Sequence, residues 1–289
     1  MTRGIILALL AAFSWGSAIV MSKISLDELG AGSLFFFQVC AATVLSWLML
    51  IGTGKKLTVS RTSLLAYSTG LFEPFLAYIL TLYGLKHVQA GIASVIFSLE
   101  SAFILILSVI IFRMRIRSPW IFLLLLIVAM AGSLMVVLPD AGEKDANIMG
   151  YFLVLAGVIS AAFYVVISSK LVDVFDPVNL LTGQLTFSFI MSSIFLIVSG
   201  EPVSLPEHSI LLVILSGVLQ YFLAFLFYLH ALKWIEVHIA GVMLYFIPVI
   251  VVILSYFFLG EKLSFIQVSG IILTIISVYI LNRKYDSEY

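Results

Sequence analysis

The sequence predicts an all-α integral membrane protein with ten transmembrane helices, arranged as two inverted repeats of five helices. Hydrophobic residues make up 63% of the 289 residues and charged residues only 10%, with a mean hydropathy of +1.22. A soluble domain carries about 25% charged residues. Apolar runs long enough to cross a hydrocarbon core of about 30 Å recur along the chain. A segment of the first half also recurs in the second half.

Glycine, proline and charge clusters divide the chain into ten apolar runs. They are expected at 4–22, 31–52, 63–84, 87–112 and 119–138, then at 148–168, 177–199, 209–232, 238–259 and 264–282. The first run has no clear cleavage site after it, so a transmembrane helix is favoured over a signal peptide. The polar segment 139–147 separates two expected repeats, 1–138 and 148–289, and a short cytoplasmic tail ends the second.

The internal repeat is clearest where residues 70–95 align with 217–242 without a gap, at a shift of 147 and with ten of 26 positions identical. Glu73 meets Gln220 in this alignment, and Gln38 meets Gln184 at a shift of 146. Each half has an odd number of spans, so matching helices run in opposite directions. Transporters with such inverted repeats usually bind substrate near the bilayer midplane, between the halves.

The basic residues are unevenly distributed between the two sides of the predicted membrane. With the N-terminus in the cytoplasm, eleven of the fifteen Lys and Arg lie on the cytoplasmic side. This bias predicts a multi-pass protein of the cell (inner or cytoplasmic) membrane with both termini in the cytoplasm. Arg113, Arg115 and Arg117 are interpreted as a topology determinant near anionic lipid, not as a nucleic-acid site.

Several short motifs carry a resemblance to a known family. They are Phe13-Ser14-Trp15-Gly16 in the first helix, Pro248 in the ninth, the run from Phe257 to Leu263 that contains Leu-Gly-Glu-Lys, and Gly270 in the tenth. On these residues the chain resembles the ten-helix EamA-type members of the drug/metabolite transporter superfamily, along essentially its whole length. The resemblance implies two inverted five-helix halves around a central cavity, which move a small metabolite by alternating access.

The chain also departs from the family's pattern. Gln38 replaces a basic residue often seen in the second helix, and Ser101, directly after Glu100, stands where the second half has Pro248. These departures make the first half more acidic within the membrane. A substrate assignment borrowed from members with a basic pocket is therefore disfavoured.

Two acidic residues are expected near the middle of the membrane: Glu73 in the third helix and Glu100 in the fourth. Ionised carboxylates are costly there and by default face a protein interior or a water-filled cavity. Each is therefore a candidate both for substrate binding and for proton coupling. The alternative is that one of them only hydrogen-bonds a neighbouring helix. Pro74 favours a kink next to Glu73.

Aromatic and amide side chains complete the candidate substrate site. Aromatic faces attract ammonium groups, and Trp15, Tyr78 and Tyr245 are the preferred candidates; Phe72, Tyr164 and Tyr221 supply further aromatic surface, although packing is an equally good explanation for each. Gln220 and Gln38 are too polar to face lipid. They either bind substrate or join helices, and for Gln38 the second role is at least as well supported.

The sequence therefore predicts a secondary-active carrier, an exporter or exchanger, of an amino acid, amine or other cation-bearing compound, with protons as a candidate coupling ion. Residues 52–56 do not form a phosphate-binding loop, and the single cysteine, Cys40, cannot build a disulfide framework within one chain. No enzymatic activity, cofactor, metal or nucleic-acid partner is expected, and the oligomeric state is left open. The alternatives are an uncoupled facilitator of a neutral metabolite, a non-transporting membrane protein and a lipid-acting enzyme.

Overall fold

The computed structural model describes residues 2–26, 28–85, 96–97, 99–113, 118–137, 148–258 and 264–285. Throughout these ranges every regular element is helical, and the predicted fold class is confirmed: eight helices are long and apolar enough to span a membrane, and two shorter apolar helices complete a set of ten. The expected linker at 139–147 and the Leu-Gly-Glu-Lys run lie outside the described residues.

The first half begins with α1 (Thr2–Ser25) and α2 (Ala31–Gly52). The third span is built from α3 (Arg61–Tyr67), η1 (Ser68–Leu71), η2 (Phe72–Leu76) and α4 (Ala77–Leu85). The fourth ends with α6 (Glu100–Phe112), and its expected segment 87–95 lies outside the described residues. The fifth is α7 (Pro119–Val137).

The second half begins with α8 (Ile148–Val174) and α9 (Pro177–Ser199). The eighth span follows as η4 (Glu207–Ser209), α10 (Ile210–Gly217), η5 (Val218–Leu223) and α11 (Ala224–Ala231), the ninth as α12 (Val237–Met243) and α13 (Phe246–Phe258), and the tenth as α14 (Phe265–Tyr285).

One predicted helix end is wrong: the sixth helix was expected to stop at 168, whereas α8 continues to Val174. The apolar run ends where charged residues begin, but the helix itself does not have to. A charged residue can extend a helix beyond the hydrocarbon core, because its side chain reaches water. The exposed Lys170 does this, with its Nζ 4.9 Å from the centre of the Phe112 ring.

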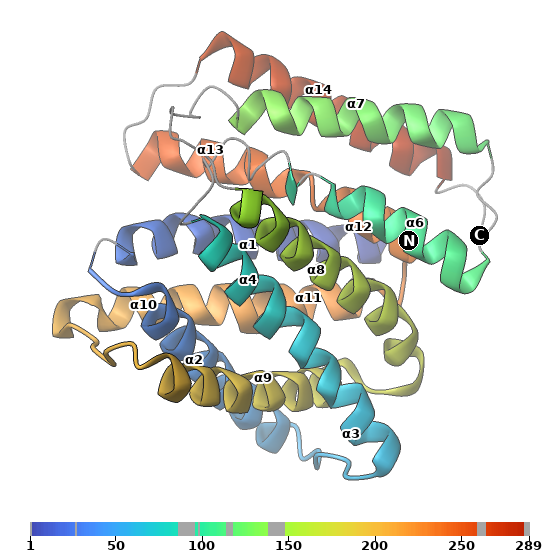
Figure 1. The fold of residues 1–289 in the computed structure, drawn as a ribbon. Coiled ribbons are helices and arrows are strands. Elements are labelled where there is room, and N and C mark those ends of the chain that lie inside the picture. The colour runs from blue at the N-terminus through green and yellow to red at the C-terminus, as the bar shows by residue number, and fades with distance from the viewer. Residues whose placement is uncertain are drawn as a thin grey trace.

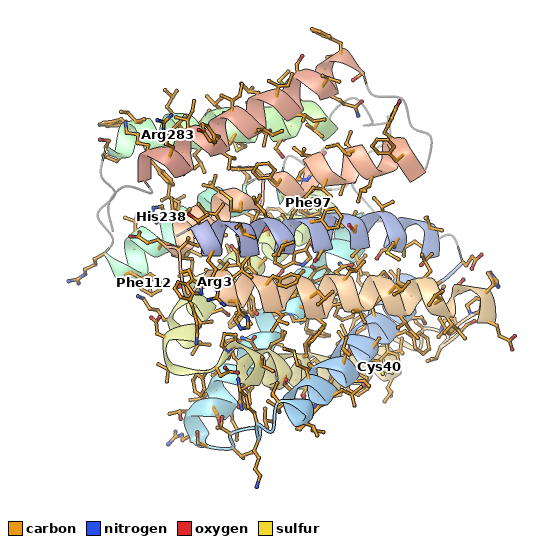
Figure 2. All side chains as sticks on the ribbon, turned by 180° about the vertical axis from the view of Figure 1, so that it is seen from behind. Arg3, Cys40, Phe97, Phe112, His238 and Arg283 are labelled. Atoms are coloured by element: carbon orange, nitrogen blue, oxygen red, sulfur yellow. The ribbon has the colours of Figure 1, made fainter. Side chains whose placement is uncertain are left out.

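The helices pack across the two halves rather than within each half (Figure 1). α1 packs on α11 and α13, α2 on α9 and α10, α4 on α8, and α7 on α14, and the α7–α14 pair forms one edge of the bundle. α1 begins and α14 ends on the same side of the bundle. Figure 2, seen from behind, places Arg3 and His238 near that side, where the Arg3 guanidinium carbon lies 5.0 Å from the centre of the Trp234 ring.

Two glutamines at equivalent positions of the repeat join the halves in the same way. Gln38 of α2 donates from Nε2 to Ser216 Oγ at 2.7 Å, and Gln184 of α9 donates from Nε2 to Thr69 Oγ1 at 2.7 Å. Thr69 and Ser216 are themselves equivalent at the shift of 147. The same buried contact therefore occurs twice, once from each half into the other.

Close backbone contact accompanies each of these hydrogen bonds. A Cβ atom added at Gly70 would overlap the Gln184 backbone, and one added at Gly217 would overlap the Gln38 backbone. Glycine therefore allows α2 to approach α10, and α9 to approach η1, more closely than any other residue would.

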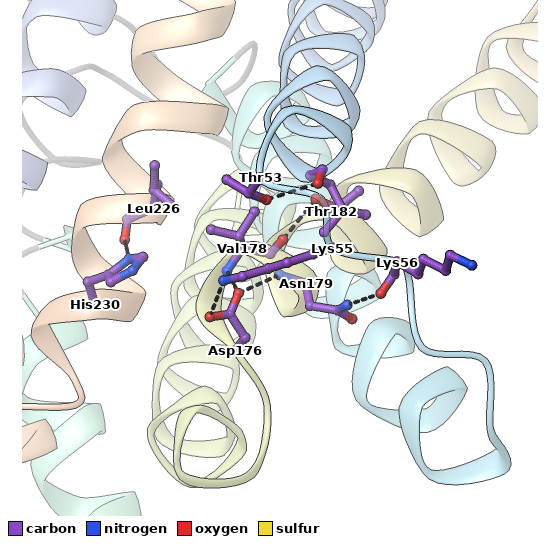
Figure 3. A network of polar contacts seen from close by, with 10 residues as sticks. Thr53, Lys55, Lys56, Asp176, Val178, Asn179, Thr182, Leu226 and His230 are labelled. Carbon is purple, nitrogen blue, oxygen red and sulfur yellow. Dashed lines mark hydrogen bonds and ion pairs between the residues drawn. The ribbon is translucent and has the colours of Figure 1, made fainter.

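The ends of the α2–α9 pair are also tied in a symmetric way. On the side where α1 begins, Lys55 Nζ lies 2.8 Å from Asp176 Oδ2, and Asn179 Nδ2 donates to the Lys56 carbonyl at 2.7 Å (Figure 3). Each contact joins the segment after α2 to the start of α9.

The opposite side has the equivalent arrangement with the halves exchanged. The Gly32 N–H donates to Glu201 Oε2 at 3.1 Å, and Ser33 Oγ donates to the Pro202 carbonyl at 2.6 Å. At a shift of 146, Ser33 is equivalent to Asn179, and Lys55 to Glu201. The segments after α2 and after α9 thus play matching roles at opposite ends of the bundle.

Candidate functional site

The third span is interrupted at the position of Glu73. Residues 68–71 form a 3₁₀ turn and residues 72–76 a wide π-type turn, within which Glu73 has φ −149° and ψ 132°, outside the helical region. The peptide bond between Glu73 and Pro74 is cis. The kink expected from Pro74 is therefore present. Ser160 Oγ of α8 donates to the Phe72 carbonyl at 2.8 Å and so satisfies a backbone group at the break.

The eighth span has a wide turn at the equivalent place. η5 covers residues 218–223 and contains Gln220, the repeat mate of Glu73. Wide turns inside helices are frequent at functional sites, and discontinuous helices in corresponding positions of two halves are typical of transporter binding sites. Both halves thus have a wide helical turn at equivalent positions, but only the third span has a residue outside the helical region, and only it places a carboxylate there.

Glu73 and Glu100 lie within electrostatic range of each other. Glu73 is buried and Glu100, the first residue of α6, is half-buried. Within the described part of the chain, no hydrogen bond or ion pair reaches either carboxylate. Two neighbouring carboxylates repel each other when both are ionised. A cationic group or a proton bound between them would relieve that repulsion.

Aromatic side chains line the region around the two carboxylates. Tyr78 is within electrostatic range of both Glu73 and Glu100 and lies beside the Gln220 side chain. Its ring is 5.0 Å from that of Tyr221, in an edge-to-face arrangement. Trp15 Nε1 is also close to the Tyr78 hydroxyl but does not meet hydrogen-bond geometry.

Tyr245 lies at the Glu100 side of this group. It is buried in the short turn between α12 and α13, and its hydroxyl interacts with the Ser101 side chain and with the charge of Glu100. Ser101 Oγ in turn donates to the Gly241 carbonyl at 2.7 Å. The first turn of α6 is therefore fixed against the ninth span.

The two candidate glutamines take different positions. Gln220 is buried next to Tyr78 and accepts a hydrogen bond from Ser22 Oγ at 3.3 Å. Gln38 donates to the same Ser22 Oγ at 2.8 Å, besides its contact with α10. Gln38 is therefore linked to Gln220 through Ser22, and its observed contacts are those of a residue that joins helices.

Sequence reasoning missed Tyr228 of α11. Its ring makes an edge-to-face contact with Trp15 at 5.4 Å, and it is within electrostatic range of both Glu100 and Glu73. The signal available in the sequence was its spacing of seven residues, two helical turns, from Tyr221, which places both tyrosines on one face of the helix. Of the seven predicted site residues, six thus lie in one central group with Tyr228, and Gln38 lies beside it.

The comparisons with known proteins agree with this architecture. The model of the EamA-like transporter family matches residues 2–138 and 148–283. An uncharacterized transporter of Archaeoglobus fulgidus is 27% identical over 284 residues, covering 98% of this chain and 100% of the relative. One of Clostridium kluyveri is 22% identical, covering 98% of this chain and 95% of the relative.

A solved structure has the same fold, with a TM-score of 0.84 over 96% of this chain and 98% of that chain, at 17% sequence identity. The family model covers nearly the whole sequence, and the ten-helix architecture with inverted repeats fits it. The chain therefore belongs to the EamA-like transporter family.

Proposed function

We propose that this membrane transporter is a secondary-active carrier of a small, cation-bearing metabolite such as an amine or amino acid derivative. The observation that carries the proposal is the pairing of Glu73 and Glu100 within electrostatic range of each other, among aromatic rings and next to the wide helical turns that contain Glu73 and Gln220. Acidic residues at such depth mark substrate or ion pathways.

The chemistry around the carboxylates supports a cation as the recognised group. Each aromatic face next to an ammonium contributes about 0.5 to 2 kcal/mol of attraction, and Trp15, Tyr78 and Tyr245 supply such faces. Gln220 adds a neutral polar group beside Tyr78. In this proposal these residues contact the substrate, while Gln38 holds α2 in place through Ser22 and Ser216.

Coupling follows from the same two acids. We infer that Glu73 and Glu100 exchange a proton for the cationic substrate, so that each protonation state favours a different accessible side. Only such differential affinity can couple an ion gradient to substrate movement. The symmetric ties at the two ends of the α2–α9 pair are where alternate closure would occur, as the halves rock about the central group.

The proposed location is the cell membrane, with both termini in the cytoplasm. Eleven of the fifteen Lys and Arg then lie on the cytoplasmic side. Arg3 at the start of α1, and Arg283 and Lys284 at the end of α14, are among these eleven. Export or exchange is the proposed direction.

A ligand screen followed by transport tests the proposal. The purified chain is heated with amines, amino acids and quaternary ammonium compounds at two pH values, and compounds that raise the melting temperature are tested for uptake into proteoliposomes. We expect cationic compounds to stabilise more at the higher pH, where protons compete less for the carboxylates, and an imposed pH gradient to concentrate them.

Other outcomes separate the alternatives. Uptake that only equilibrates the substrate, with no response to the pH gradient, would point to an uncoupled facilitator. Stabilisation by neutral compounds alone would contradict cation recognition. A protein that moves no solute and turns over or binds lipid instead would contradict the carrier.

A further inference from the structure

Two buried polar atoms at the centre of the bundle have no hydrogen-bond partner among the described residues: Trp15 Nε1 and Tyr228 Oη. Trp15 is 7% exposed and Tyr228 is 1% exposed. Their rings are in edge-to-face contact at 5.4 Å. Buried polar groups are nearly always paired in native proteins, so two neighbouring exceptions need an explanation.

Both atoms belong to the group around the two carboxylates. Tyr228 is within electrostatic range of Glu100 and Glu73, and Trp15 is close to the Tyr78 hydroxyl. Among the described side chains, the other fully enclosed polar atoms without a hydrogen-bond partner belong to Ser188 of α9, Thr274 of α14 and His238, whose Nδ1 lies 3.1 Å from Glu236. The two atoms at the centre are thus the ones that lie where a substrate is proposed to bind.

The chemistry of the two atoms defines what could pair with them. An indole N–H is a donor only, and a tyrosine hydroxyl donates one hydrogen bond. Their shared requirement is therefore an acceptor oxygen. Beside two carboxylates a second anion would be repelled, which favours a neutral oxygen such as a hydroxyl, ester or amide group.

We propose that Trp15 Nε1 and Tyr228 Oη recognise a neutral acceptor oxygen on the substrate, next to the cationic group that Glu73 and Glu100 recognise. The inference rests on the proposed function and narrows it: the substrate class is an amine with a neighbouring hydroxyl, ester or amide oxygen, rather than a simple alkylamine. A site built to hydrogen-bond such an oxygen rejects analogues that lack it, because its buried donors are then left unpaired.

Matched ligand pairs test this on the full-length purified chain. The probes are leucinol against isoamylamine and phenylalaninol against phenethylamine; the members of each pair share the ammonium group and differ by a hydroxymethyl group that only the first member carries. Apparent affinities come from thermal-shift titrations and are checked by competition for uptake into proteoliposomes. We expect the amino alcohols to bind about tenfold more tightly than the amines, as one or two added hydrogen bonds provide.

The variant Tyr228→Phe should remove much of that preference while the simple amines keep their affinity. Trp15→Phe should also reduce the preference, and it should weaken both members of each pair, because Phe offers a poorer aromatic face to the ammonium group. Tyr228→Phe has a second readout that needs no ligand. If its hydroxyl is unpaired in the empty protein, removing it leaves the melting temperature unchanged or raises it. Tyr164→Phe is the matched control, since the Tyr164 hydroxyl donates to Gln184 Oε1 at 3.0 Å and its loss should lower the melting temperature and leave the preference in place.

The outcomes distinguish this inference from the proposed function. Equal affinity for the members of each pair, unchanged by Tyr228→Phe, overturns the acceptor site and leaves cation recognition standing. A lowered melting temperature of ligand-free Tyr228→Phe also overturns it, since the hydroxyl would then have a structural partner. Failure of all four probes to bind, when neutral compounds do bind, overturns both.

Discussion

Gln38 and Gln184 stand 146 residues apart in the sequence, yet each donates the same buried hydrogen bond into the opposite half of the protein, to Ser216 and Thr69 respectively. Both amides are almost completely buried. In a bilayer the hydrophobic effect does not hold helices together, so packing and interhelical hydrogen bonds must do so. The two glutamines are therefore expected to contribute to stability in equal measure.

Replacing either glutamine by leucine should destabilise the protein by similar amounts. Each change removes the hydrogen bond that a buried hydroxyl accepts, at a cost of about 0.5 to 1.5 kcal/mol, while the hydroxyl still donates to a carbonyl of its own helix. The measurement is the free energy of unfolding in mixed detergent micelles for Gln38→Leu and Gln184→Leu. Val44→Ala, on the lipid-facing side of α2, is the control and should cost much less. A large loss for one glutamine and none for the other would contradict the symmetric role.

The glycines that lie against the backbones of Gln38 and Gln184 provide a second prediction. Gly70→Ala and Gly217→Ala each place a Cβ against the backbone of a neighbouring helix, and such overpacking costs about 1 to 3 kcal/mol. Gly52→Ala, at the end of α2 with open space around its Cα, is the matched control and should be neutral or slightly stabilising. The melting temperatures of the three variants check this prediction. A decrease for Gly52→Ala as large as that for Gly70→Ala would refute it.

Much of the fold follows from the sequence, because a hydrocarbon core of fixed thickness sets the length of each helix. The number of helices and most helix ends were predicted correctly. The end of α8 was not, since hydropathy reports where the apolar run stops, whereas hydrogen bonds and snorkelling side chains decide where the helix stops. The sequence pattern also did not predict how far the helix is interrupted at residues 68–76. Pro74 indicates a kink, but it does not indicate the extended backbone of Glu73.

The candidate site could be predicted only in part. Glu73, Glu100 and Gln220 were found because polar residues at mid-membrane depth are costly. Tyr228 was missed because hydropathy does not distinguish a lipid-facing tyrosine from a central one within an apolar helix, and its seven-residue spacing from Tyr221 indicates only a shared helix face. The contacts of Gln38 depend on Ser216, which is 178 residues away, and no local pattern reports such a pairing.

Asp176 should make stability depend on pH at acidic values. Burial alone would raise the pKa of this carboxyl, but hydrogen bonds from Lys55 and from the backbone N–H groups of Asn179 and Val178 outweigh it and hold the pKa below its usual value. Its contribution is therefore fully present above the unfolded pKa of about 3.9 and is lost as the pH falls through the lower folded pKa.

Three variants check this prediction through their melting temperatures between pH 3 and pH 7. Asp176→Ala should cost about 1 kcal/mol, because the side chain also caps the first turn of α9. Lys55→Ala should cost less, since an exposed ion pair contributes about 0 to 1 kcal/mol. Asp176→Asn keeps the helix cap, so its melting temperature should approach that of the natural protein as the pH falls toward 3. A melting-temperature difference that instead grows as the pH falls would mean that folding raises the pKa of Asp176 rather than lowering it.

Glu100→Gln should weaken the binding of a cationic amine more than that of its uncharged N-acetyl derivative. Removing one of two carboxylates lowers the attraction for an ammonium group but leaves the aromatic surface intact. We expect about a tenfold loss for leucinol, equivalent to about 1.4 kcal/mol, and little change for the uncharged N-acetylleucinol. Thermal-shift titrations of both ligands measure the ratio, and equal losses would argue against charge recognition.

Glu73→Gln tests the coupling role, because it converts Glu73 into the residue that its repeat mate, Gln220, already is. The change preserves shape and polarity but removes the exchangeable proton, so the protein should fold normally and lose the ability to concentrate substrate when a pH gradient is imposed on proteoliposomes. Glu207→Gln makes the same chemical change at an exposed position in η4, outside the central group and the α2–α9 ties, and should keep gradient-driven uptake. If Glu73→Gln retained the pH dependence of the natural protein, the proton would have to be carried by another group, and Glu100 alone would remain as the candidate within the central group.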